Sequence, residues 1–424
     1  MDKISNLFKN KLIKNGIWLL VLEAFNCVLP FLTIPYITRI LTPEKYGVFS
    51  IGLSWISYLQ ILVIYAFDLS ATRKLALCES EDEQRRIYTR VMAARFILCL
   101  FSALILVVFF LVLQVSHETK LCMLVLFIMV VGNAIEHNWF FKGKEDVKQI
   151  TIVNVICRVV TTILIFVFVK DTSDILVYCL LYSVNYVFAG IFSGVLARAK
   201  YRIRLIRIHI REIGEELKEG FILFLSSAMT KIFAGFGIIY LGLVATDAIV
   251  GVYSALTKIP NLIITLWMPI SQVIYPAISK VFAVSFANGI RKLKKIAVPI
   301  LVIFAFGLLV ISVGHLWIVE LLFGADYLQD ASVLVIMCVW VFVGIVNNFL
   351  GTQALVGSGH TKRYTISFLM SLVCNLVLIV VLGNILSLYG IALANLVSET
   401  LLTVIVFSQV CYLQKIEGGG NQIE

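Results

Sequence analysis

Apolar stretches of about 20 residues recur along the whole chain, separated by short polar connections. A stretch of this length can cross the hydrocarbon core of a bilayer as an α-helix, and only helices or closed barrels satisfy their backbone groups there. Hydrophobic residues make up 60% of the chain and charged residues only 14%, too few charges for a water-facing surface. We therefore predict an all-α integral membrane protein.

The hydropathy pattern predicts twelve transmembrane helices. Their approximate limits are 15–36, 46–67, 91–115, 121–141, 150–169, 175–197, 220–243, 249–276, 296–318, 331–353, 364–384 and 389–412. If both termini lie on one side, that side holds 27 of the 35 Lys and Arg residues, the other side four and the spans four. Because cytoplasmic connections retain Lys and Arg, we expect both termini to be cytoplasmic.

The longest inner connection divides the twelve spans into two sets of six. We predict an N-terminal six-helix bundle over 1–197, a cytoplasmic linker over 198–219 and a C-terminal six-helix bundle over 220–424. The linker is strongly basic and then acidic, which favours a juxtamembrane helix on anionic lipid; docking of a cytoplasmic partner is the alternative.

The two halves also resemble each other in sequence. Positions 14–50 align without a gap with 218–254 and give ten identities in 37, including a shared T-x-x-x-x-G-V-[FY]-S stretch. Six spans per half give the two repeats the same orientation, related by an axis along the membrane normal. Such an arrangement encloses a central cleft between two bundles, which is typical of transporters.

Several functional classes find no support in the sequence. The net charge of +10 would favour nucleic acid in a soluble protein, but here the basic residues flank spans, where lipid headgroups and topology account for them. The motifs G-x-x-x-x-G-K-[ST], D-x-D, H-E-x-x-H and G-x-S-x-G do not occur, and the five His residues lack metal-ligand spacing. We predict no catalytic residues, no metal, no cofactor and no nucleic-acid partner: a transporter, not an enzyme.

Charged residues deep inside the predicted spans are the candidates for function. A charge at the bilayer centre costs roughly 2.5–3.5 kcal/mol and normally faces water or a partner. Polar residues at helical spacing accompany several of these charges, which indicates a wet face. We predict a cationic, substrate-binding cavity formed by Arg158, Lys231, Lys258, Asn261 and Asn154.

Three acidic residues are predicted to couple transport to an ion or to pair with cavity charges: Glu23, Glu399 and Glu136. Glu136 and the adjacent His137 lie near the inner end of a span, where a proton relay and a structural role are both open. For all the deep charges, buried ion pairs that fix helix packing are the alternative. Arg95 and Asp68 lie nearer the inner face, and we assign them mainly to topology because snorkelling is cheap there.

Proline is concentrated in two of the predicted spans. Span eight contains Pro260, Pro269 and Pro276, and span one contains Pro30 and Pro35. Each proline removes a backbone hydrogen bond and crowds the preceding turn, so both spans are predicted to bend.

Specific segments resemble a known family. The segment 30–50, PFLTIPYITRILTPEKYGVFS, resembles the opening of Wzx-type polysaccharide flippases, whose superfamily also holds the multidrug and toxin extrusion transporters. The segments WFFKG at 139–143 and KQITI at 148–152 are similar to the same family's WFFQG and the segment after it. With twelve spans in two halves, the resemblance covers nearly the whole chain.

The resemblance implies a V-shaped central cavity between two six-helix bundles in the bacterial cytoplasmic (inner) membrane. It also implies flipping of an undecaprenyl-diphosphate-linked oligosaccharide, an O-antigen or related surface polysaccharide repeat unit, by alternating access. Membrane lipid, a coupling ion (H⁺ or Na⁺) and other membrane proteins of polysaccharide assembly are the implied partners. The family's cavity charges follow no fixed motif, so Arg158, Lys231 and Lys258 rest on depth and polarity alone.

Two other functions stay open from the sequence. An ion-coupled drug or metabolite exporter of the same superfamily would favour an acidic cavity. The five deepest charges here are instead three positive and two negative: Arg158, Lys231, Lys258, Glu23 and Glu399. A membrane glycan polymerase or ligase would ordinarily carry a large outer loop with catalytic Arg or His residues. The longest outer connections here have about a dozen residues, which counts against that class.

Overall fold

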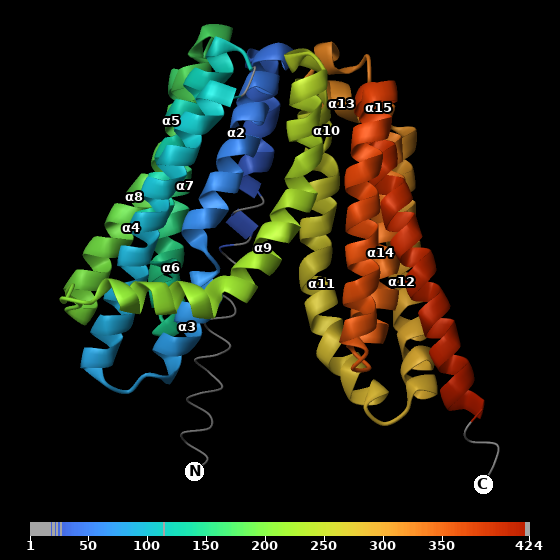
Figure 1. Ribbon diagram of the computed structural model, residues 1–424. Helices are drawn as coiled ribbons and strands as arrows, with labels where there is room; N and C mark the ends of the chain where they lie inside the picture. Colours follow the sequence, from blue (N-terminus) through green and yellow to red (C-terminus); the bar gives the residue numbers. More distant parts are fainter. Residues whose placement is uncertain (1–17, 19–21, 23, 26–27, 113–114, 420–424) are drawn as a thin grey trace. The chain divides into compact units, whose positions relative to one another are not determined.

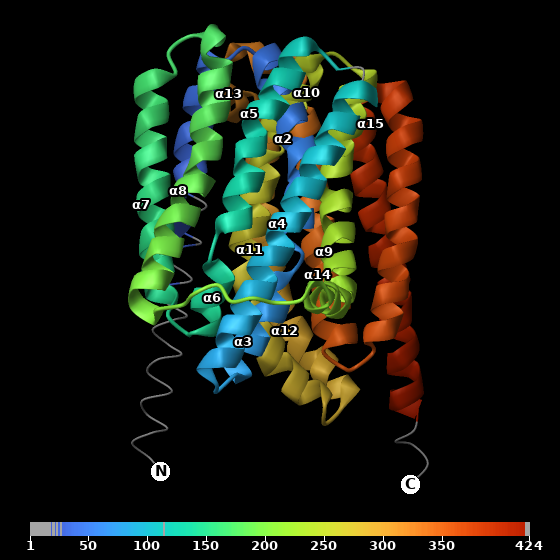
Figure 2. The same ribbon diagram turned by 60° about the vertical axis from the view of Figure 1, so that its left-hand side comes forward.

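The computed structural model describes residues 18, 22, 24–25, 28–112 and 115–419. All regular structure in these residues is helical, which confirms the predicted all-α fold. A short apolar helix covers Val28–Ile40. The other α-helices, labelled in Figures 1 and 2, are α2 (Pro43–Ile64), α3 (Phe67–Leu77), α4 (Glu81–Val112), α5 (His117–Ile135), α6 (Asn138–Gly143), α7 (Val147–Phe168), α8 (Ile175–Tyr201), α9 (Ile210–Val244), α10 (Asp247–Leu256), α11 (Lys258–Phe282), α12 (Phe286–Val313), α13 (His315–Phe323), α14 (Val333–Asn348) and α15 (Thr361–Gly419).

Many of these helices are long and apolar enough to cross a membrane. Within the described ranges there are nine such stretches, or up to ten if the two parts of α9 count as one bent span. The chain is thus a multi-pass membrane protein. The number of twelve spans, the V-shaped cavity and the cytoplasmic position of both termini stay predictions.

The longest helix, α15, is a hairpin of two antiparallel arms. Its backbone leaves the helical region at Ser387, where φ is 52° and ψ is −128°. The Ser371 hydroxyl donates to the Ser398 carbonyl (2.7 Å), and Asn375 donates to the side chain of Asn395 (3.0 Å). The two arms, visible side by side in Figure 1, therefore correspond to the predicted spans 364–384 and 389–412.

The helices group into two compact units, Met1–Gly235 and Phe236–Glu424. The division falls inside α9, whereas the predicted bundles are separated at 198–219. Most of that connection is helical, because α8 continues to Tyr201 and α9 begins at Ile210. The limits of the two predicted bundles and of the linker stay predictions.

In the first unit, α5 and α8 pack closely through glycines. A Cβ atom on Gly132 would lie 2.6 Å from the backbone of Tyr186, and one on Gly190 would lie 2.5 Å from the side chain of Ile135. Small residues let membrane helices approach until their backbones nearly touch. This contact fixes α8 beside the end of α5, where several charged residues lie.

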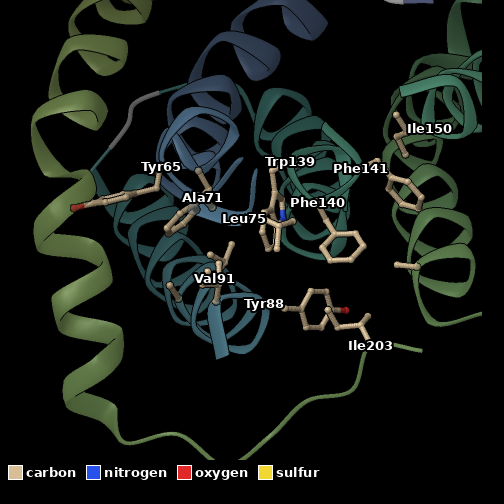
Figure 3. Packing of buried hydrophobic residues seen from close by; sticks show 14 of the residues in the cluster. Tyr65, Ala71, Leu75, Tyr88, Val91, Trp139, Phe140, Phe141, Ile150 and Ile203 are labelled. Atoms are coloured by element: carbon tan, nitrogen blue, oxygen red, sulfur yellow. The ribbon is translucent and has the colours of Figure 1, made fainter. Parts of the chain in front are cut away.

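An aromatic cluster anchors the chain that follows α5. The WFFKG segment forms most of α6, and its side chains Trp139, Phe140 and Phe141 are completely buried. Figure 3 shows them gathered with Tyr88 and other apolar residues of the same cluster. The motif noticed in the sequence therefore has a packing role, and it holds the preceding polar residues in place.

Aligned residues of the two predicted repeats make equivalent contacts in their own units. The Tyr36 hydroxyl donates to the carbonyl of Val169 after α7 (2.7 Å), and the Tyr240 hydroxyl donates to Val380 in α15 (3.1 Å). In the predicted numbering these are the fifth and eleventh spans, the fifth of each half. Thr42 and Thr246 likewise occupy the position before α2 and α10. These contacts agree with an internal repeat.

Candidate functional site

Two predicted site residues of the first unit belong to one polar network. On α7, Asn154 donates to the side chain of Asn138 (3.0 Å), and the Asn138 amide in turn donates to the Glu136 carboxylate. Arg158 lies one turn further along α7 and is half-buried. Both Arg158 and Glu136 interact electrostatically with Tyr186 of α8. The structure thus brings Asn154, Arg158 and Glu136 into one neighbourhood.

A buried ionic cluster adjoins this network. The Arg95 side chain is 1% exposed and donates to the carbonyls of Glu136 (2.8 Å) and Asn133 (3.2 Å) at the end of α5. It also contacts the Asp68 carboxylate (3.4 Å), which accepts a second hydrogen bond from Lys142 (3.0 Å). The prediction that Arg95 snorkels is wrong, because its two terminal nitrogens bind carbonyls at a helix C-terminus and a carboxylate inside the protein, while its Nε has no acceptor among the described residues.

His137 is held by hydrogen bonds on both ring nitrogens. Its Nε2 lies 2.8 Å from the Tyr88 hydroxyl and its Nδ1 lies 3.4 Å from the Ser193 hydroxyl. The ring is buried between α4 and α8. Of the two roles left open by the sequence, this environment favours the structural one for His137.

Lys231 lies on α9 in the first unit. Its side chain is exposed and forms no ion pair or hydrogen bond with any residue in the described ranges. The neighbouring Thr230 hydroxyl donates to the carbonyl of Ser226 in its own helix (3.0 Å). The fold of the described residues therefore makes no use of this ammonium group. Glu23, the acidic candidate of the first span, lies outside the described residues.

In the second unit, Lys258 is the first residue of α11, and α10 ends two residues earlier at Leu256. Thr257 between them keeps helical dihedral angles (φ −62°, ψ −17°), and Pro260 follows within the first turn of α11. The predicted bend of span eight stays a prediction. The half-buried Lys258 has no ion pair or hydrogen-bond partner for its ammonium group in the described part of the chain. Asn261 lies about one turn further on and is exposed.

Glu399 is a half-buried carboxylate in the second arm of α15. It accepts a hydrogen bond from the Asn347 side chain (2.8 Å), and Gly344 lies opposite, where an added Cβ would be 3.8 Å from the carboxylate. Among the described residues, no Lys, Arg or His forms an ion pair with it. Its surroundings on α14 and α15 are uncharged.

Sequence reasoning missed the amide groups near Glu399. After Asn347, the chain forms a π-helical segment, Phe349–Val356, and such segments are frequent at functional sites. Asn348 accepts from the Ser271 hydroxyl (2.8 Å), and Gln353 donates to the same hydroxyl (2.9 Å). The side-chain oxygens of Asn347 and Gln353 are buried without a donor among the described residues. Three amide side chains within seven residues of predicted span ten were the available signal.

The described residues contain no group of three His, Cys, Asp or Glu side chains that could hold a metal ion. In the first unit, several candidate residues belong to one polar network. In the second unit, Lys258 and Glu399 are two separate charged residues. Such groups can bind anions, hydrogen-bond to sugars and exchange a proton or a cation.

The sequence profile described as "Polysaccharide biosynthesis protein" matches residues 12–282, more than half of the chain. The chain belongs to this family. This confirms the resemblance drawn from the segments at 30–50, 139–143 and 148–152.

Two curated bacterial relatives carry the name "Putative O-antigen transporter". One, from Escherichia coli (strain K12), is 27% identical over 94% of this chain and 96% of its own length. The other, from Shigella dysenteriae, is 27% identical over 66% of this chain and 70% of its own length. Their names are those of transporters, the class predicted here from the sequence.

Solved structures share the fold of this polysaccharide biosynthesis family member. A lipid II flippase MurJ in an inward closed conformation matches with a TM-score of 0.74 at 14% identity, over 94% of this chain and 87% of that one. An inward-facing multidrug resistance MATE family transporter of the MOP superfamily matches with a TM-score of 0.64, over 92% and 99%. At this identity the likeness establishes a common fold of membrane transporters.

Proposed function

We propose that this protein flips an undecaprenyl-diphosphate-linked oligosaccharide, an O-antigen or related surface polysaccharide repeat unit, across the bacterial inner membrane. Membership of the polysaccharide biosynthesis family and the names of the two curated relatives support this substrate class. The fold shared with a lipid II flippase supports movement of a lipid-linked substrate by alternating access.

One observation carries the proposal: Lys258 has no acidic partner in the described part of the second unit, although it lies within an apolar span. A charge in such a position is expensive unless it meets water or an ion of opposite sign. A diphosphate passing through the protein supplies that negative charge, whereas its polyprenyl tail remains in lipid. Lys231 in the first unit likewise lies in a predicted span and has no acidic partner among the described residues.

The oligosaccharide requires hydrogen-bonding groups rather than charge. Asn261 is exposed one turn beyond Lys258, and its amide can both donate to and accept from sugar hydroxyls. Asn154 lies one turn from Arg158 and is already oriented by Asn138. Lys258 and Arg158 each lie about one turn from an amide on the same helix, an arrangement that suits a phosphate joined to a sugar.

We assign ion coupling to Glu399 rather than to Glu136. Glu399 accepts a single hydrogen bond, from Asn347, and no basic side chain among the described residues neutralises it. Binding of H⁺ or Na⁺ would remove a charge that is costly in an apolar span. The Glu136 carboxylate instead accepts from Asn138, which also binds Asn154, and the Glu136 carbonyl accepts from Arg95, so Glu136 belongs to the polar network of the fold.

The substrate proposal is tested with single lysine variants in a bacterial strain that lacks its own flippase for a defined surface polysaccharide. Lys258→Ala and Lys231→Ala are each expected to lower surface polysaccharide by about tenfold or more, because each removes a charge-assisted contact with phosphate. Immunoblotting of membranes checks that the variants insert at wild-type level.

Two matched controls remove a lysine from the same helices. Lys280→Ala on α11 and Lys218→Ala on α9 change the charge equally, and both side chains are exposed outside the predicted spans. Both controls should retain polysaccharide export. Wild-type export by Lys258→Ala and Lys231→Ala would refute the cationic-cavity account, and export of a cationic drug in place of polysaccharide would favour the exporter alternative.

A further inference from the structure

A surface pocket of 590 Å³ lies where α8 ends and the connection to α9 begins. Three of the described residues that line it are arginines and two are apolar: Arg198, Arg202, Ile203, Arg204 and Leu205. The proposed transport function assigns no role to this pocket, which belongs to the first unit alone. Its concentration of positive charge indicates an anionic ligand.

The three arginines differ from their basic neighbours because the fold does not use their charge. Neither Arg198, Arg202 nor Arg204 forms an ion pair or a side-chain hydrogen bond with a residue in the described ranges. By contrast, Lys200 in the same stretch pairs with Asp146 (2.6 Å), and Arg90 pairs with Glu212. Three guanidinium groups around one concavity repel one another, and a bound anion would relieve that repulsion.

The local backbone holds these side chains in place. Arg202, the residue directly after α8, has the left-handed conformation (φ 49°), which glycine usually adopts at the end of a helix. The next residue, Ile203, is buried and lies near Tyr88 in the aromatic cluster, as Figure 3 shows. Because Ile203 is anchored, the exposed Arg202 and Arg204 on either side are fixed at the rim of the pocket rather than on a free loop.

An apolar stripe on α8 leads directly to the pocket. Phe188, Ile191, Phe192 and Val195 are all exposed, and their spacing continues along the helix to Arg198. In a membrane-spanning helix such a stripe faces acyl chains, and arginines at its end lie at the level of lipid phosphates. A ligand that carries both a phosphate and acyl chains therefore fits this surface better than a free anion.

A neighbouring pocket of 450 Å³ offers a useful contrast. It shares Arg202 and Ile203 with the first pocket, but acidic Glu81 lines it as well. Its Lys144 donates to Gln84 and lies over the rings of Phe140 and Tyr201, and burial lowers the pKa of Lys144. Apart from the shared Arg202, its basic groups are engaged, because Arg85 and Lys200 form ion pairs and Lys144 donates to Gln84. An anion is therefore expected in the pocket at the end of α8.

We propose that the pocket at the end of α8 binds the phosphate group of an anionic membrane phospholipid, whose acyl chains lie along the apolar stripe of that helix. Guanidinium groups match this ligand because each can donate two parallel hydrogen bonds to phosphate oxygens. The site is separate from the residues proposed for transport. The basic connection 198–219 would then bind one specific lipid molecule, in addition to being attracted to the membrane surface in general.

The test measures lipid binding to the purified full-length protein by native mass spectrometry in detergent. Phosphatidylglycerol should bind at least tenfold more tightly than phosphatidylcholine. The double variant Arg198→Gln with Arg204→Gln should bind phosphatidylglycerol about tenfold more weakly than wild type. Inorganic phosphate at millimolar concentration should fail to displace the lipid, since it offers no acyl chains to the stripe.

The matched control is Arg207→Gln with Arg211→Gln, which removes two positive charges from the same connection outside the pocket. This control should bind phosphatidylglycerol as wild type does. Equal losses in the two double variants, equal binding of the two lipids, or full displacement by inorganic phosphate would each overturn the proposal. Because all four arginines are exposed, unchanged unfolding temperatures in phosphatidylcholine are expected and check the folding of both double variants. The single variant Arg204→Gln should likewise bind phosphatidylglycerol more weakly than the single variant Arg207→Gln.

Discussion

Charges inside membrane-spanning helices are handled in opposite ways around Arg95 in the first unit and around Lys258 and Glu399 in the second unit. In the first unit, the buried Arg95 is matched by Asp68 and by carbonyl oxygens, and Asp68 is shared with Lys142. In the second unit, Lys258 and Glu399 each lack a partner of opposite charge among the described residues. A matched charge belongs to the fold, whereas an unmatched one remains available to a ligand or an ion.

This contrast has an energetic basis. Removal of one member of a buried ion pair leaves the other uncompensated and typically costs about 3–5 kcal/mol. Removal of a buried charge that has no counter-ion takes away an unfavourable desolvation instead, so the fold loses little. The two kinds of charge should therefore separate cleanly when stability and transport are measured on the same variants.

The largest effect on stability is expected from Arg95→Met. The methionine fills a similar volume but leaves Asp68 without one of its partners and the Glu136 carbonyl without its donor. We expect the free energy of unfolding to fall by roughly 3–5 kcal/mol. Arg85→Met on the same helix, where the pairs with Glu81 and Asp82 are exposed, should cost at most about 1 kcal/mol. Denaturant titration in detergent measures the free energy of unfolding of both variants. Equal losses of stability would contradict the distinction between matched buried charges and exposed ones.

Next in size is the effect of Gly132→Ala in the first unit. The new Cβ would lie 2.6 Å from the backbone of Tyr186, which cannot rotate away, so α5 and α8 must separate. A loss of about 1–3 kcal/mol is expected from this overpacking. In the second unit, Gly307→Ala on α12 meets nothing within 4 Å and should be neutral or stabilising. Unfolding temperatures of the two variants measure this difference. A similar loss of stability in both would mean that the close packing of α5 against α8 is not its cause.

The sequence predicted those features of the fold that leave a clear signal in hydropathy. Long apolar runs predicted the helical class and placed several long helices, such as α4, α7 and α12, close to predicted spans, because lipid imposes length and composition on any spanning helix. The hairpin turn at Ser387 falls between the predicted spans 364–384 and 389–412.

The candidate site was predictable only in part. Depth and polarity singled out Glu399, Lys258 and the neighbourhood of Asn154 and Glu136. They failed for Arg95, because hydropathy cannot tell a snorkelling arginine from one satisfied by carbonyls of a neighbouring helix. The uncharged Asn347 was overlooked because charge was the criterion for a candidate, and only the fold places its amide 2.8 Å from Glu399.

A smaller stability effect, with a large effect on transport, is expected for Glu399→Gln. The glutamine oxygen still accepts from Asn347, so stability should change by less than about 1 kcal/mol. If Glu399 couples transport to an ion, flipping in vesicles should lose its dependence on an H⁺ or Na⁺ gradient. The control Glu118→Gln removes a carboxylate paired with Lys45 at the start of α5 and should leave that dependence intact. Gradient-dependent flipping by Glu399→Gln would shift the coupling role to another carboxylate.

The smallest effect concerns a charge pair that is matched but partly exposed, Lys45 with Glu118 (2.6 Å), whose side chains are 31% and 34% exposed. If matching alone made a charge part of the fold, this pair would count as much as Arg95 with Asp68. Because water and salt screen it, a double-mutant cycle with Lys45→Met and Glu118→Gln should give a coupling of only about 0.2–1 kcal/mol, declining in high salt. A salt-insensitive coupling as large as that of Arg95 with Asp68 would show that matching rather than burial decides. The expected weak value would show that a charge becomes structural only when it is both matched and removed from solvent.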